Sequence, residues 1–213
     1  MANTNSPFGF QQYQGGAGGA PTFAETQRLI ASTNTFQLFT GDPVNPVITT
    51  ANGYITAGVP GTVRIDGIFN GCAYLSTAQK RTVWSNYWPG SDATGAVTAQ
   101  VIDDPNARFI CQGNSTTFNI TGTVASPTAT PVGQYAQYAI GTGNTANGRS
   151  GAFLNSLGTT VTFPFIVLAL PGLGAGGPPG SDGTDVLSAS NDVIVGFNNE
   201  MLRANGAGPT GIS

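Results

Sequence analysis

The side-chain types that most often carry catalysis or bind metals are scarce in this sequence. No histidine occurs among its 213 residues, which excludes catalytic triads, general bases and metal sites that depend on an imidazole. Cys72 and Cys111 each lie in an apolar stretch, without the base or cationic neighbour that activates a thiolate. We expect two buried free thiols, because nothing marks the chain for export, with a disulfide between them as the alternative.

The acidic residues include two short groups that could hold a cation. Asp103 and Asp104 are adjacent, so on an extended chain their side chains point to opposite faces and do not readily share a proton. Pro105 follows them, which favours an ordinary turn. Asp182 and Asp185 lack the ligand spacing of an EF-hand loop. Neither group therefore predicts a metal site.

A glycine-rich stretch at 141–146, GTGNTA, fits the dinucleotide-binding pattern G-x-G-x-x-A. That motif opens a helix after a parallel strand and needs an acidic residue about 20 positions further on. Here NGRSG follows directly, and the sequence near residue 166 is FIVLAL. We interpret the stretch as a loop. The sequence accordingly predicts no catalytic residues, no cofactor and no metal, and the protein is expected not to be an enzyme.

The aromatic stretch RTVWSNYWPGSD, Arg81–Asp92, holds both tryptophans of the chain. Trp84 and Trp88 are four positions apart, so on a single strand they would lie on one face. With Tyr87 they could form a platform for a sugar, on which cations also stack. Large aromatic rings equally anchor subunit interfaces or close the end of a sheet. We favour packing, or packing extended into a subunit contact, over sugar binding.

Charge is unusually sparse, because only 8% of the residues are Asp, Glu, Lys or Arg and the net charge is −3. The seven cations are scattered singly except for Lys80 and Arg81, which are expected to keep the tip of a turn solvated. No basic stripe is present that would displace counterions, so we expect no nucleic-acid partner. A surface this poor in charge fits either a subunit of a larger assembly or an ordinary weakly acidic domain.

The longest apolar run is Thr160–Leu170, which is interrupted by Pro164. It is too short to span a bilayer, so we expect no membrane partner. We predict that this run is a buried strand.

Residues 1–21 are predicted to be an extended arm. Phe8, Phe10 and Tyr13 stand in a background of glycine and glutamine without helical or strand periodicity. The segment lacks the charged and apolar regions of a signal peptide. Two interpretations stay open: the aromatic rings dock on another surface such as a neighbouring subunit, or the arm is a floppy tail.

Residues 22–125 carry regular β signals. Thr22–Ile30 begins like a capping box, which predicts a short helix. From residue 35 on, strand-like runs recur about every 10 to 12 residues, which predicts a small β-barrel or sandwich. Asn52-Gly53 lies between two alternating runs and predicts a hairpin, because both positions of a type I′ turn need positive φ.

Residues 126–213 are expected to form a β-rich C-terminal region. It contains a long Gly/Pro loop, PGLGAGGPPGSDG at 171–183, and ends in an alternating strand within NDVIVGFNN, 191–199. That last strand either packs back on the barrel or belongs to a looser separate region. The predicted fold class is mostly β: a small β-barrel or sandwich with an extended N-terminal arm and long Gly/Pro loops.

Several short motifs follow one another in a recognisable order: FTGDPV, NGYI, DGIFNGCAY, SNYWPG, VIDDPNARF, GNTANGRSG and DVIVGFNN. This order resembles that of head decoration (cement) proteins of tailed bacteriophages. The likeness covers roughly residues 30–199, and two segments depart from it: the arm FGFQQYQGGAGGAP and the 171–183 loop match no motif of that family.

The resemblance implies a structural virion protein on the outer surface of the capsid, without catalytic residues. Such a protein bridges major capsid subunits and contacts neighbouring copies of itself, which a trimer would accommodate. The candidate partner contacts are Phe8, Phe10, Tyr13, Trp84, Tyr87 and Trp88. The alternative is a receptor- or carbohydrate-binding module of a phage tail or an adhesin, which depends on the aromatic rings of the stretch Arg81–Asp92.

Overall fold

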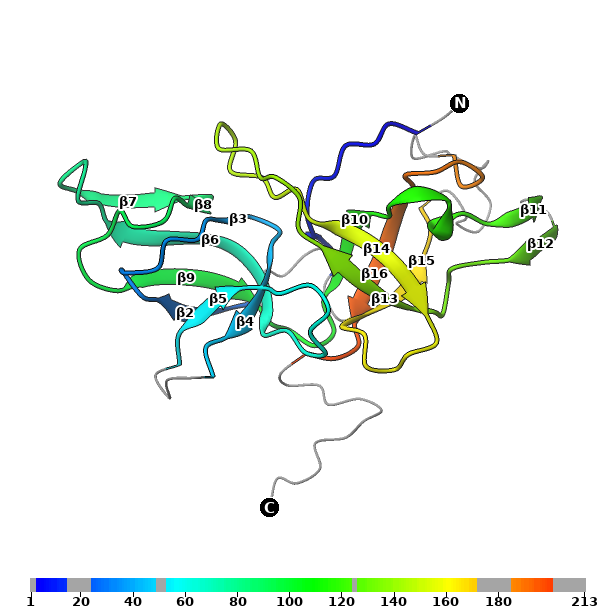
Figure 1. Cartoon of the computed structure of the whole chain (residues 1–213), viewed down its shortest axis with the longest axis horizontal. Coiled ribbons are helices and arrows are strands. Elements are labelled where there is room, and N and C mark those ends of the chain that lie inside the picture. Colours follow the sequence, from blue (N-terminus) through cyan, green and yellow to red (C-terminus); the bar gives the residue numbers. More distant parts are fainter. Residues whose placement is uncertain (1–2, 15–23, 49–52, 124–125, 172–184, 201–213) are drawn as a thin grey trace, which may run out of the picture.

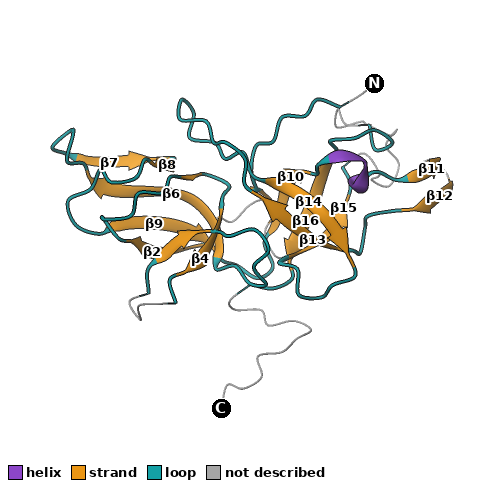
Figure 2. Cartoon of the chain, viewed as in Figure 1, coloured by secondary structure: helices purple, strands orange, loops and turns teal. Residues whose placement is uncertain are grey.

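The computed structural model describes residues 3–14, 24–48, 53–123, 126–171 and 185–200. Almost all regular structure in these residues is β, and the one helical segment is a single 3₁₀ turn, η1 (Ser115–Phe118). Figures 1 and 2 show the strands gathered into two lobes placed side by side. The mostly β fold class is therefore confirmed.

The first lobe is an antiparallel sheet in the order β2-β9-β6-β4-β5, with β7 paired to the other part of β6. The short strands β3 and β8 pair beside it. The two ends of this strand order are joined by a single isolated bridge, Leu29–Tyr54, and not by a strand ladder. The sheet therefore curls towards a barrel but does not close into one. The strands are β2 (Glu25–Ile30), β3 (Leu38–Phe39), β4 (Pro43–Pro46), β5 (Ile55–Ala57), β6 (Gly67–Leu75), β7 (Thr82–Ser85), β8 (Tyr87–Trp88) and β9 (Val97–Ile102).

The second lobe is a six-stranded antiparallel sheet in the order β1-β10-β16-β15-β13-β14. A separate two-stranded ribbon, β11 with β12, projects from it (Figure 1). The strands are β1 (Gln11–Gln14), β10 (Arg108–Gln112), β11 (Thr121–Thr123), β12 (Ser126–Ala129), β13 (Tyr135–Ala139), β14 (Phe153–Gly158), β15 (Phe165–Ala169) and β16 (Asp192–Phe197).

Each lobe has its own hydrophobic core. The first is built around Phe69, Trp88 and the aliphatic side chains of β2, β4 and β9. The second gathers the aromatic rings of β10, β13, β15 and β16. Ile68 and Ile102, which are paired across β6 and β9, pack into the second core. The two lobes are therefore joined by apolar packing as well as by the chain.

The sheets part earlier in the chain than the division expected at residue 126. The chain passes from the first sheet to the second between β9 and β10, at residues 103–107. The last strand, β16, does pair with a strand of the 22–125 region, because β10 lies beside it from Arg108–Gly196 to Gln112–Asp192. A turn signal thus marks the boundary at Asp103–Pro105, while the Pro/Thr link near 126 lies within the second lobe.

The short helix predicted over Thr22–Ile30 is wrong in its described part, because Glu25–Ile30 is strand β2. Six residues of β2 pair in unbroken register with β9, from Glu25–Ile102 to Ile30–Val97. Ile30 is fully buried at the end of this strand. Long-range pairing has outweighed the local capping signal, as tertiary context commonly does.

The predicted arm docks on its own chain over the described residues. Strand β1 pairs with β10, and the Gly9 and Phe10 amides donate to the carbonyls of Ala152 and Gly41 at 3.1 and 3.0 Å. Phe10 is 1% exposed and stacks on Phe165 with ring centroids 4.4 Å apart. Residues 3–14 are therefore a structural part of the second lobe.

The predicted hairpin around Asn52-Gly53 is present as strands β4 and β5, which pair from Val44–Ala57 to Pro46–Ile55. Gly53 has the expected positive φ of 69°, whereas Asn52 lies outside the described residues. The apolar run Thr160–Leu170 contains β15, with Phe165 and Val167 buried as predicted. No helix among the described residues is long and apolar enough to cross a membrane.

Candidate functional site

The aromatic stretch is divided between two strands, which places its tryptophans in opposite environments. β7 ends at Ser85 and β8 begins at Tyr87, so the chain changes strands at Asn86. Trp88 is fully buried and meets the edge of Tyr74 with ring centroids 5.1 Å apart. Packing of this ring in the core of the first lobe is confirmed. The same-face arrangement considered for a single strand does not occur.

Trp84 is the most exposed aromatic side chain among the described residues, at 77%. It lies on β7, where it pairs with Ala73 of β6. Val83, its neighbour on the strand, packs against the first core. Because side chains alternate across a strand, the indole of Trp84 is directed to solvent.

Tyr87, the next aromatic residue along the chain, is held in place by contacts with the first lobe. It is half-buried, and its ring stacks on Phe39 at 5.4 Å with an interplanar angle of 8°. Its main-chain carbonyl accepts a hydrogen bond from the Cys72 thiol at 3.6 Å. Cys72 and Cys111 are both free and buried, as the sequence predicts.

A groove of about 260 Å³ lies between Trp84 and the tip of the β13–β14 hairpin, and we call it the Trp84 groove. The hairpin tip belongs to the second lobe (Figure 1). The groove therefore has one wall from each lobe. The lining residues are Trp84, Ser85, Asn86, Tyr87, Thr145, Ala146, Asn147 and Gly148.

The two walls of the groove are fixed by main-chain hydrogen bonds. The Thr40 amide donates to the carbonyls of both Asn86 and Gly148, at 3.0 and 2.9 Å, and the Ser150 amide donates to Thr40 at 3.0 Å. Gly148 has a φ of +73°, and a Cβ there would lie 2.6 Å from the Cβ of Asn86. Only glycine fits this close approach without displacement.

A second hollow of about 210 Å³ lies against the same residues, Trp84, Ser85 and Asn86. Its remaining wall is formed by Asn70, Gly71, Cys72 and Gln100. Among the described residues that line the two hollows, none carries a charge. The linings of the two hollows beside Trp84 are therefore aromatic and neutral polar.

Lys80 and Arg81 lie at the tip of the β6–β7 hairpin, both exposed, as expected for charges at a turn. Lys80 has a φ of 55°, and its amide donates to the Ser76 carbonyl at 3.0 Å. The tip is fastened to Asp92, whose carboxylate accepts from the Ser76 and Thr77 hydroxyls at 2.7 and 2.8 Å. These hydrogen bonds, with one from the Ala78 amide, lower the pKa of Asp92.

The remaining candidate partner contacts, three in the arm and Trp88, differ in how far their side chains are exposed to solvent. Phe10 is buried in the core of the second lobe, and Trp88 is buried in the core of the first. Neither side chain can therefore contact a partner in this fold. Tyr13 is 42% exposed on the edge strand β1. Phe8 is half-buried beside a hollow of about 330 Å³ that also contains Arg149. The hollow beside Phe8 shares Asn147 with the lining of the Trp84 groove, whereas Tyr13 lines neither of them.

The motifs that the sequence analysis assigned to turns and loops are turns and loops in the structure. Asp104 makes the predicted turn, because its side chain accepts from the Asn106 amide at 2.9 Å. Asp185 likewise accepts from Leu187 and Ser188, at 3.0 and 2.9 Å, while residues 182–184 lie outside the described part. The GTGNTA stretch is the loop of the β13–β14 hairpin, as interpreted.

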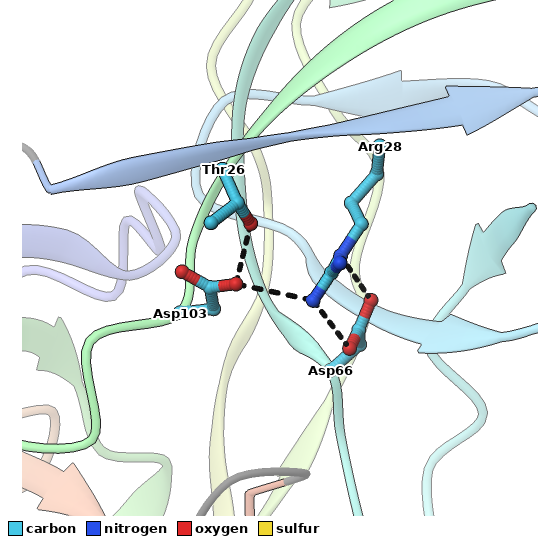
Figure 3. A network of polar contacts seen from close by, with 4 residues as sticks. All are labelled: Thr26, Arg28, Asp66 and Asp103. Carbon is cyan, nitrogen blue, oxygen red and sulfur yellow. Dashed lines mark hydrogen bonds and ion pairs between the residues drawn. The ribbon is translucent and has the colours of Figure 1, made fainter. Parts of the chain in front are cut away.

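Asp103 belongs to a charged cluster that the sequence does not reveal (Figure 3). The Arg28 guanidinium contacts Asp66 and Asp103, each at 3.1 Å, and the Thr26 hydroxyl also donates to Asp103. Both carboxylates are almost fully buried, and burial raises the pKa of Asp66 although Arg28 opposes that shift. The residues of this cluster come from β2 and from the ends of β6 and β9, which lie far apart in the sequence. No local residue spacing could therefore have predicted the cluster.

No metal-binding group of three or more His, Cys, Asp or Glu side chains is found among the described residues. Comparison with known protein families, with curated proteins and with solved structures gives no match to this chain.

Proposed function

We propose that this protein is a structural virion protein, a decoration subunit that binds the outer surface of a phage capsid and bridges major capsid subunits. The observation that carries the proposal is a set of apolar side chains exposed on both lobes of a surface with very little charge. Trp84 is the largest of them, at 77% exposure. Among the described residues, the others more than half exposed are Ile48 and Val59, with Val63 at 50%.

Exposure on both lobes supports bridging. Leu75 and Trp84 lie on the first lobe, while Val161, Leu168 and Leu187 lie on the second. A stable contact buries about 800 Å² on each partner, and several weaker contacts reinforce one another when one rigid body makes them together. A two-lobed subunit with apolar side chains on each lobe is suited to touch more than one neighbour.

The contacts that join the lobes also support the proposal, since a bridge must transmit load. The Phe10 amide donates to Gly41 of the first lobe while its ring fills the core of the second. Ile68 and Ile102 add apolar packing across the junction. The resemblance of the motif order to phage decoration proteins implies the partners in this proposal. These are the major capsid protein and neighbouring copies of this chain, arranged as a trimer. The role consists of binding, without a catalytic step.

Rebinding to capsids tests the proposal. Purified protein is mixed with phage heads from which it has been stripped, and the bound fraction is measured by co-sedimentation. We expect saturable binding and heads that resist heating better than stripped ones. Trp84→Ala should weaken binding at least about tenfold, because large aromatic anchors dominate interfaces.

Location is tested separately by antibody-gold labelling of intact particles. Regular labelling over the head is expected. Absence of rebinding, or labelling confined to the tail tip, would overturn the proposal and favour receptor recognition instead. Sedimentation velocity of the free protein tests the trimer.

A further inference from the structure

We infer that the Trp84 groove is a binding site for a neutral saccharide unit. This site goes beyond capsid bridging, and because Trp84 is also the proposed capsid anchor, Asn147 is the groove residue that separates the two kinds of binding. It joins the exposed indole of Trp84 on β7 to uncharged polar side chains on the β13–β14 hairpin.

The first argument is the exposed indole. A sugar ring has an apolar face of C–H groups, which packs well on the face of a tryptophan or tyrosine. Trp84 offers its ring at the edge of the groove, with 77% of the side chain open to solvent. Tyr87 lies beside it and is held in place by stacking on Phe39. The aromatic wall is therefore present before any ligand arrives.

The second argument is the polar lining. The side-chain amide of Asn86 and the hydroxyl of Thr145 make no hydrogen bond with another described residue, and both line the groove. The Asn147 oxygen accepts from the Arg149 amide at 2.9 Å, which fixes that side chain and leaves its NH₂ group to donate. Amides and hydroxyls that act as both donors and acceptors match the hydroxyl groups of a sugar.

The third argument is charge. None of the described residues that line the groove or the second hollow is ionised, and Arg149 lines the hollow beside Phe8 rather than the groove. A phosphate or carboxylate in the groove would therefore be desolvated without a cationic residue in its lining. No acidic side chain is present in these linings to hold calcium between protein and sugar. The chemistry points to a neutral ligand whose binding does not require a metal.

The fourth argument is size. The groove encloses about 260 Å³, slightly below the roughly 300 Å³ at which drug-sized ligand sites begin. This volume suits a single sugar unit. The second hollow lies against the same Trp84 and carries the Gln100 amide, also without a partner among the described residues. A neighbouring unit of the same glycan can extend into it.

The test is a titration of the full-length protein with two matched panels of oligosaccharides, one neutral and one bearing carboxylates or sulfates, up to about 10 mM. Tryptophan fluorescence is the readout. Trp88 is buried, so a ligand-dependent change reports on Trp84. We expect at least one neutral oligosaccharide to bind saturably, with the same affinity in the presence of a chelator.

The variants separate this site from the capsid contact. Trp84→Ala and Asn147→Ala should each weaken saccharide binding at least tenfold, measured for both by competition with a labelled glycan. Tyr13→Ala, remote from the groove, should leave it unchanged. Asn147→Ala should still rebind stripped heads, so failure of saccharide binding and failure of capsid binding are read independently.

The inference is overturned if no neutral oligosaccharide of the panel binds, if only the acidic panel binds, or if binding survives both groove substitutions. Since Trp84 and Asn147 are exposed, neither substitution should prevent folding. Circular dichroism of each variant verifies this.

Discussion

The hydroxyl of Ser150 donates a hydrogen bond across the junction of the lobes to the carboxylate of Asp42. Asp42 precedes β4 in the first lobe, and Ser150 precedes β14 in the second. The other carboxylate oxygen accepts from the Phe39 amide at 2.7 Å. Only 3% of Asp42 is exposed, and this burial raises its pKa to about 6 although both hydrogen bonds lower it.

The elevated pKa of Asp42 makes one part of the stability dependent on pH. The folded protein holds a proton on this group up to about pH 6, whereas the unfolded chain releases it near 3.8. The free energy of unfolding therefore decreases as pH rises from about 4 to about 6, by an amount on the order of 3 kcal/mol. Asp42→Asn removes the charge and should be more stable than the wild type above pH 6.

Chemical denaturation of both proteins between pH 4 and 7 checks this prediction. The stability difference between Asp42→Asn and wild type should grow over that range and then level off. Asp92→Asn is the matched opposite, because the pKa of Asp92 is lowered. That carboxylate contributes stability at neutral pH which is lost as pH falls, so its replacement should destabilise at pH 7. A pH-independent difference for Asp42→Asn would contradict the role of burial.

Phe10 should be essential for stability although it lies in the predicted arm. Its ring is 1% exposed and contacts both Phe165 and Tyr138. Truncation of a fully buried phenylalanine leaves a cavity and costs about 3–5 kcal/mol. Phe10→Ala should lower the free energy of unfolding by that amount, measured by denaturation, while Tyr13→Ala should change it by less than about 0.5 kcal/mol. Equal effects of the two would restore the floppy-tail interpretation.

Local sequence signals predict several turns and one hairpin well, because these depend on neighbouring residues. The Asn52-Gly53 hairpin signal and the Asp104 turn are found where turn chemistry places them. Two buried thiols follow equally from their apolar surroundings. These features require no knowledge of which distant segment lies opposite.

Long-range pairing is what the sequence does not disclose. β16 pairs with β10 across some eighty intervening residues, and this assigns β10 to the second sheet. The opposite environments of Trp84 and Trp88 arise because the chain changes strands at Asn86. A single strand and a broken one have the same residue spacing, so spacing alone cannot distinguish a surface ring from a core ring.

Arg28 should stabilise the protein mainly by compensating two buried carboxylates. Its side chain is 31% exposed, whereas those of Asp66 and Asp103 are 4% and 7% exposed. Arg28→Met would leave both acids without a cation, a change that costs roughly 3 kcal/mol at pH 7. Loss of the cation raises the pKa of Asp66 further, so the penalty should shrink as pH falls and Asp66 becomes protonated.

Denaturation at pH 7 and pH 4 measures this effect, and Arg28→Lys serves as the control. Lysine keeps the charge but loses the planar fork that contacts both acids, so its penalty should be smaller. If Arg28→Met costs the same at both pH values, packing of the side chain rather than charge compensation explains its contribution.

Gly143 should tolerate no side chain, for a packing reason unrelated to nucleotide binding. A Cβ at this position would lie 2.2 Å from Cδ2 of Phe39, whose ring already stacks on Tyr87. Gly143→Ala should therefore cost about 1–3 kcal/mol through overpacking, measured by thermal or chemical unfolding. The exposed neighbour Thr142 is the matched control, and Thr142→Ala should change stability by less than about 0.5 kcal/mol. Because the displaced Phe39 ring supports Tyr87, Gly143→Ala should also alter the fluorescence of the adjacent Trp84. A neutral effect on both stability and fluorescence would show that the hairpin tip moves away from the first lobe at no cost.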